Sequence, residues 1–222
     1  MKTIVRMGVV LLGLSLAIAI APRPGNPAQV AAADSMSAIA HKSAFHDAMR
    51  KLWEDHITWT RLFIVSAATE PTDLPDIGPT VDRLLANQTD IGNAIKPFYG
   101  AAAGTELTAL LRVHILTAAE VVADAKAGNA AAVADASRRW YANGDAIATF
   151  LNAANPRFWP LAEMRSMMKA HLDLTLAEAV ARLQGRYADD VVAYDRVHAE
   201  ILQMADMLSD GIVAQFPASF AG

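Results

Sequence analysis

Three histidines recur along the chain at nearly constant spacing. His56, His114 and His171 are separated by 58 and 57 residues, and large apolar residues stand three and four positions before each of them. That phase places each imidazole on the buried face of a helix. A buried neutral imidazole needs a partner for each ring nitrogen, and a metal ion or a carboxylate network can supply it. The repeat therefore indicates one candidate site for chemistry that depends on imidazole.

A second series lies about midway between these histidines. Gln88, Asn143 and His198 follow one another at intervals of 55 residues, and an acidic residue stands two positions after each of them. Two positions correspond to about 200° of rotation on an α-helix, so the acids are expected on the rim or in contacts between hairpins, and not on the same inward face. Gln88 and Asn143 are expected to hydrogen-bond to the histidine that faces them. His198 is expected to be a fourth inward imidazole.

Several inward imidazoles favour coordination of a transition metal ion, with Zn, Cu or Fe as the candidates. Methionines close to two of the histidines are compatible with Cu(I), which thioether ligands suit. A metal-free interpretation stays open. If the hairpin was duplicated, one structural core histidine would recur at the same spacing without any metal. The predicted metal ligands are His56, His114, His171 and His198, supported by Gln88, Asn143, Thr117, Asp195 and Met168.

The elements that must position these side chains are helices. Apolar residues recur at spacings of three and four in alanine-rich segments, and no segment alternates with period two. The internal period of about 57 residues indicates a helical hairpin repeated three times, over residues 35–98, 102–155 and 160–217. We expect an all-α, six-helix up-and-down bundle, or else a short helical array. Only closure of the hairpins around an axis would bring the histidines together.

Turn and capping residues predict where the helices end. Asp76 and Asn129 are expected to cap the helices that follow them, and Gly128 and Gly185 are expected to stop the helices that precede them. Pro97 is expected to end the first hairpin, because proline cannot continue a helix without losing a hydrogen bond.

Residues 1–33 have the composition of a secretory signal peptide followed by a proline- and alanine-rich spacer. A basic start precedes an apolar run, and small residues stand just before Asp34, where cleavage is predicted. The prediction is a periplasmic or secreted protein with one domain over residues 34–222 and no stable membrane insertion after cleavage. An uncleaved N-terminal anchor is the alternative.

Charge and missing motifs exclude several classes of function. Without residues 1–33 the chain carries 16 basic and 23 acidic side chains, which argues against a nucleic-acid partner. The chain has no cysteine, so disulfides and thiolate chemistry are excluded. It also lacks a glycine-rich phosphate loop, a Gly-x-Ser-x-Gly elbow and a His-Glu-x-x-His motif. An enzymatic activity is therefore uncertain and less expected than binding.

Three segments resemble a bacterial family of all-helical proteins, some of them exported. They are residues 53–61 (WEDHITWTR), 138–146 (RRWYANGDA) and 204–207 (MADM). Members of that family carry conflicting names, among them glycosyltransferase and acetylglutamate kinase, and the resemblance implies no catalytic residues. The residues themselves support neither name, since the chain has no Asp-x-Asp motif, no nucleotide-binding glycine pattern and no α/β alternation.

The leading hypothesis is thus an exported helical protein that binds a transition metal for storage, transfer or sensing. The alternative is a metal-free helical interaction or small-ligand module whose histidines only pack. The identity of the metal, the physiological partner and the oligomeric state are left open.

Overall fold

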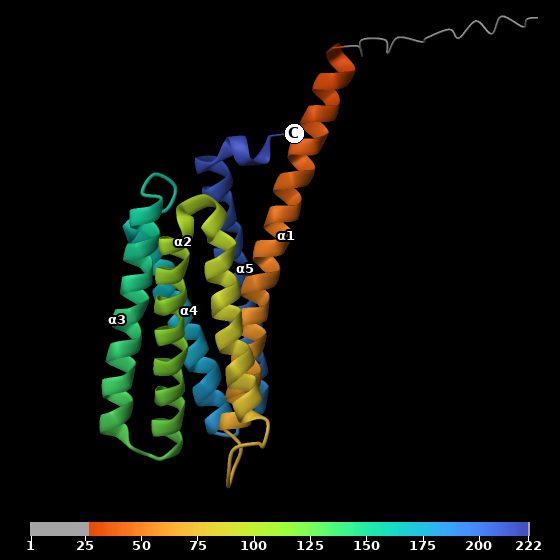
Figure 1. Cartoon of the computed structure of the whole chain (residues 1–222). Helices are drawn as coiled ribbons and strands as arrows, with labels where there is room; N and C mark the ends of the chain where they lie inside the picture. The colour runs from red at the N-terminus through yellow and green to blue at the C-terminus, as the bar shows by residue number, and fades with distance from the viewer. Residues whose placement is uncertain (1–26, 222) are drawn as a thin grey trace, which may run out of the picture.

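The computed structural model describes residues 27–221 and is built from helices (Figure 1). The elements are α1 (Pro27–Ala67), α2 (Ile77–Lys126), α3 (Ala130–Ala154), α4 (Leu161–Leu183), α5 (Tyr187–Gln215) and the short 3-10 helix η1 (Pro217–Phe220). The described residues contain no strand, so the prediction of an all-α fold is confirmed.

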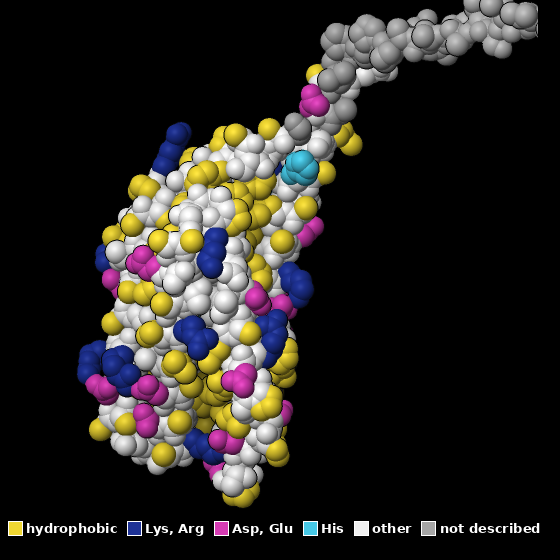
Figure 2. Space-filling model, in the orientation of Figure 1, with side chains coloured by type: hydrophobic (Ala, Val, Ile, Leu, Met, Phe, Trp, Pro, Cys, Tyr) yellow, Lys and Arg dark blue, Asp and Glu magenta, His cyan; other side chains and the backbone are white. Residues whose placement is uncertain are grey.

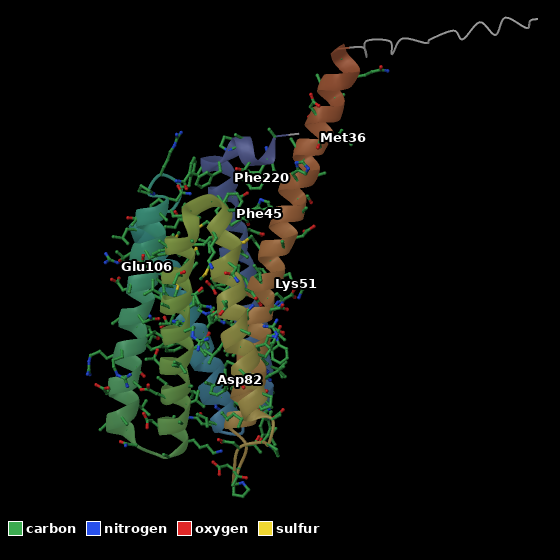
Figure 3. All side chains as sticks on the ribbon, in the orientation of Figure 1. Met36, Phe45, Lys51, Asp82, Glu106 and Phe220 are labelled. Carbon is green, nitrogen blue, oxygen red and sulfur yellow. The ribbon has the colours of Figure 1, made fainter. Side chains whose placement is uncertain are left out.

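Most of the predicted signal segment, residues 1–26, lies outside the described residues. The predicted cleavage point before Asp34 falls inside α1, which begins at Pro27 rather than near Ser35 as expected. The first turns of α1 extend beyond the rest of the bundle, and Met36 there is 70% exposed (Figures 1 and 3). No helix of residues 27–221 is long and apolar enough to cross a membrane.

The helices pack in a closed order around one core. Each helix contacts the next in sequence, and α5 returns to pack along α1. This contact excludes the linear array, in which the first and last helices would lie far apart. A closed bundle is the arrangement that allows side chains from α1, α2 and α4 to reach a common interior.

The predicted count of six separate helices is not confirmed, because the second and third expected helices are parts of α2. Pro97 lies inside this element, and the chain reverses at Gly100, whose φ of 85° and ψ of 168° are not helical. Arg112 of the second arm (residues 101–126) donates to the carbonyl of Leu85 in the first arm (residues 77–99) at 3.4 Å. The two arms are therefore antiparallel. Gly100 can adopt the positive φ of this tight turn without steric cost.

The predicted capping residues behave differently from one another. Asn129 caps α3 as expected, since its side chain accepts a hydrogen bond from the Ala132 N–H at 3.1 Å. Gly128 and Gly185 follow α2 and α4 with φ of 70° and 68°, as helix-ending glycines do. Asp76 precedes α2, but its carboxylate does not cap the helix. It accepts instead from the Ser66 hydroxyl at 2.8 Å and so ties the end of α1 to the start of α2.

Aromatic rings close the end of the bundle from which α1 extends. Phe220 of η1 lies against Phe45 of α1, with ring centroids 5.1 Å apart, and it stacks on Phe98 at 5.7 Å (Figure 3). Charged side chains of both signs are interspersed on the face seen in Figure 2. Ion pairs such as Arg165 with Asp145 link neighbouring helices. The interior is left to apolar residues and to the polar layer described below.

We predict that Gly92→Ala destabilises the fold by about 1–3 kcal/mol, the usual cost of overpacking. A Cβ at this position would lie 1.9 Å from the Thr108 hydroxyl oxygen and 2.5 Å from the Gly104 carbonyl oxygen, so the arms of α2 would have to separate. Urea unfolding of Gly92→Ala measures this cost. Gly78→Ala is the matched control, because nothing lies within 4 Å of its Cβ and alanine favours the helix. Equal stability of the two variants would show that the arms do not pack as described.

Candidate functional site

His56 of α1, His114 of the second arm of α2 and His171 of α4 form one buried layer. The ring centroids of His56 and His171 lie 5.8 Å apart, and those of His114 and His171 lie 6.1 Å apart. The three residues are 2–3% exposed. The closed packing of the helices thus brings together three of the four histidines predicted as ligands. We call this group the histidine layer.

Two rings of the histidine layer are held in place through Nδ1. The Nδ1 atom of His114 lies 3.1 Å from the side-chain oxygen of Asn143, and that of His171 lies 3.1 Å from a carboxylate oxygen of Glu200. Both partners accept from an N–H at Nδ1, which fixes the tautomer that leaves the lone pair on Nε2. Across the described part of the chain, neither Nε2 atom has a hydrogen-bond partner.

His56 differs from the other two. Its Nδ1 atom is buried and makes no hydrogen bond of normal length and angle among residues 27–221, and the same holds for Oε1 of Gln88. The Gln88 side chain is nevertheless close enough to His56 to oppose the lowering of its pKa. The amide nitrogen of Gln88 donates to the Leu84 carbonyl at 2.8 Å and to the Asn87 side chain at 3.1 Å. Gln88 therefore lies beside His56 as predicted, but its own hydrogen bonds are directed along α2.

Two indole rings pack against the layer. Trp53 lies on His56 with centroids 5.9 Å apart, and Trp140 lies on His114 at 5.5 Å. The Nε1 atom of each indole is buried and unpartnered within the described structure. Unsatisfied polar atoms of this kind are few in native folds, and here they concentrate around the histidines. The layer is therefore a polar centre enclosed by apolar and aromatic packing.

Threonine hydroxyls stabilise the helix turns that carry the histidines without touching the rings. Each hydroxyl lies three or four residues after a histidine and donates to its main-chain carbonyl. Thr60, Thr117 and Thr175 make these bonds to His56, His114 and His171 at 2.8, 3.2 and 2.9 Å. Thr117 was expected to support the imidazoles, and its hydroxyl supports the backbone instead.

His198 does not lie in the layer. Its Nε2 atom contacts a carboxylate oxygen of Glu54 at 3.0 Å, and its side chain is 31% exposed. The reason is the phase of α5, which buries Val197 and Ile201 and so turns the next position, His198, towards the surface. Asp195 is likewise exposed. Met168 is buried in the core one turn before His171, where it was predicted.

Glu200 is the site residue that the sequence reasoning placed wrongly on the rim. Both observed pairs, His114 with Asn143 and His171 with Glu200, are 29 residues apart. Glu200 also follows Asn143 by 57 residues, the interval between His114 and His171, whereas His198 follows it by 55. Applying the histidine period to the second series would have identified Glu200.

A second polar cluster lies two helical turns beyond His171 on α4. The guanidinium of Arg61 donates to Glu178 at 2.9 Å and forms a bidentate pair with Asp190. Both carboxylates are fully buried. Burial outweighs the contact with Arg61 and raises the pKa of Glu178 to about 7. This cluster joins α1, α4 and α5 at the end of the bundle opposite the aromatic rings.

Burial also controls the protonation of the histidines. It lowers the pKa of His114 to about 3, with a smaller effect from the neighbouring His171. It holds the pKa of His56 well below its usual range, again with contributions from the other imidazoles. These two rings are neutral at ordinary pH, which is the state in which imidazole binds metals.

As the side chains stand, no group of three or more histidine or acidic residues within 27–221 has the arrangement needed to hold a metal ion. Comparisons with protein-family models, with curated proteins and with solved structures find no match. What the histidine layer can do must therefore be argued from its own geometry.

We predict that acid destabilises the protein through His56 and His114. The unfolded chain binds protons at these residues near pH 6.5 and the folded protein does not, so their stabilising contribution is complete above that pH and is lost towards pH 3. Glu178 acts in the opposite direction between about pH 7 and 4.5, where the folded protein alone binds its proton. Two histidines outweigh one carboxyl, so stability should fall gradually between about pH 6.5 and 4.5 and more steeply below pH 4.5, by a few kcal/mol in all.

Urea unfolding between pH 3 and pH 7 separates the two effects. Glu178→Gln removes the opposing group, so between about pH 6.5 and 4.5 its stability should fall more steeply than that of the wild type. His114→Gln should reduce the fall in either background. An unchanged pH profile in His114→Gln would show that this imidazole is not buried in its neutral form.

Proposed function

We propose that this chain is an exported helical bundle that binds one transition metal ion at the histidine layer, for storage, transfer or sensing. One observation carries the proposal. His114 and His171 are anchored through Nδ1 to side-chain oxygens, while their Nε2 atoms have no hydrogen-bond partner within residues 27–221. This is the pattern of metal-ligating histidines, whose second nitrogen donates to a carboxylate, carbonyl or water.

The third ligand of the proposed site is His56. Its buried Nδ1 atom makes no hydrogen bond within the described chain, so a cation bound to its lone pair would satisfy an acceptor that is otherwise costly to bury. Bonds from imidazole nitrogen to zinc are about 2.0–2.1 Å long, so the rings must rotate towards a common point to share an ion. Because the ring centroids are only 5.8 and 6.1 Å apart, we expect side-chain rotation to bring the nitrogens together without movement of the helices.

The partners of the histidines fit such a site. Asn143 and Glu200 occupy equivalent places, and the single carboxylate of Glu200 would offset part of the charge of a bound cation. The common 29-residue offset of the two pairs supports descent of these hairpins from one repeat. The histidine layer would then derive from one ancestral position, used three times around the bundle.

The alternative is a metal-free helical module in which the histidines only pack. The observation that favours it is the absence, within residues 27–221, of a preformed group able to hold a metal. In that case the Nε2 atoms would be satisfied by buried water. The two functions differ in one measurable property, which is saturable binding of a metal ion to the layer.

We predict that protein purified without a histidine tag binds Zn(II) or Cu(II) near one equivalent in titration calorimetry. Such binding should raise the melting temperature, because an ion that binds only the folded state stabilises it. His114→Ala should bind at least about tenfold more weakly, since it removes one ligand. The unfolding temperature of each apo variant must be measured beside its affinity, because the cavity left by His114→Ala has a cost of its own.

His198→Ala is the matched control. His198 is a histidine close to an acid on the surface, outside the layer, and its loss should leave the affinity unchanged. Equal weakening in both variants, or no saturable binding by the wild type, would favour the metal-free module.

A further inference from the structure

A surface pocket lies between α3 and α4, beside segments that carry the histidine layer. It has a volume of about 240 Å³, and its walls include Gly144 and Tyr141 of α3 and Met168 and Leu172 of α4. Gly144 directly follows Asn143, the partner of His114, and Leu172 directly follows His171. The pocket is therefore backed by the segments that carry two imidazoles of the layer and one of their anchors.

Met168 lies in the wall of the pocket on the helix that carries His171. It is 7% exposed and belongs to the core, yet it lines the pocket. Met168 precedes His171 by three residues, so the two side chains share one face of α4. A thioether is thus placed at the pocket, on the face of α4 that carries an imidazole of the layer.

Gly144 keeps this passage open. A Cβ at Gly144 would lie 3.3 Å from a methyl carbon of Leu172 and 3.7 Å from the terminal methyl of Met168. Any larger side chain at this position would fill the pocket and cover Met168. The absence of a side chain in an otherwise well-packed helix interface leaves the methionine accessible.

The two basic side chains at the mouth of the pocket are each paired with a carboxylate. Arg165 donates to both carboxylate oxygens of Asp145, at 2.5 and 3.0 Å, across the gap between α4 and α3. Lys169, also at the mouth, is paired with Asp173 at 2.6 Å. The pairing lowers the repulsion that two basic side chains would otherwise exert on an entering cation.

We infer that this pocket admits the metal ion, that Met168 is its first ligand, and that the ion is therefore Cu(I). Thioether and imidazole together select this soft monovalent cation, whereas Zn(II) gains little from a thioether. The inference rests on the proposed function, because it assumes that the histidine layer is the destination. It adds an entry route and a substrate to that site.

Silver(I), added as its nitrate in chloride-free buffer, is a suitable probe because it resembles Cu(I) and is not oxidised in air. The chain has no cysteine, so thiolate does not compete for the ion. Arrival at the layer can be followed in stopped-flow experiments by fluorescence of Trp53 and Trp140, whose rings pack on His56 and His114. Zn(II) is measured in parallel as an ion that does not depend on the thioether.

Met168→Leu should slow the silver signal by about tenfold and leave the Zn(II) signal unchanged, since only the thioether is lost. Met164→Leu is the matched control, because Met164 is buried one turn earlier and does not line the pocket. Gly144→Val, if folded by circular dichroism, should slow both ions by closing the route.

Equal silver rates in Met168→Leu and Met164→Leu, with Zn(II) still bound saturably, would overturn this inference and leave the proposed function intact. No signal from either ion in the wild type, together with no heat of binding, would overturn both.

Discussion

The burial of three imidazoles in one layer is the constraint on which the rest of the structure depends. Each ring brings two polar nitrogens out of water, and an unpaired one costs about 1–3 kcal/mol. Asn143 and Glu200 satisfy one nitrogen on each of two rings. The helices that carry these partners, α3 and α5, must therefore lie directly beside α2 and α4. Closure of the bundle through the contact of α5 with α1 then brings His56 beside His171.

Closure in turn depends on close approach between helices. The arms of α2 meet at Gly92 and Gly104, where added side chains would collide with the opposite backbone. At Gly211 of α5, the absence of a side chain makes room for the buried ring of Trp159. These glycines allow the arms of α2 to pack against each other and Trp159, just before α4, to pack against α5.

Local features of the fold could be predicted from sequence because they depend on nearby residues. Helical periodicity, the cap at Asn129 and the helix-ending glycines are set within one or two turns. The placement of Asp76 against Ser66 depends instead on how the end of α1 meets the start of α2. The position of His198 also depends on packing between helices. Because α5 buries the neighbouring Val197, His198 is turned towards the surface and away from the histidine layer. Glu200 could have been identified from the sequence by applying the interval between His114 and His171 to their partners. Glu200 follows Asn143 by the same 57 residues.

The most direct test of the account is the position of a bound metal in a crystal grown with one equivalent of Zn(II) or Cu(I). Anomalous diffraction collected at the absorption edge of that metal locates it independently of any interpretation of binding heats. The account predicts a single strong peak in the histidine layer, about 2.0–2.1 Å from ring nitrogens of His56, His114 and His171 if the metal is zinc. A peak confined to surface residues such as His198 and Glu54, with the three buried rings unchanged, would contradict it.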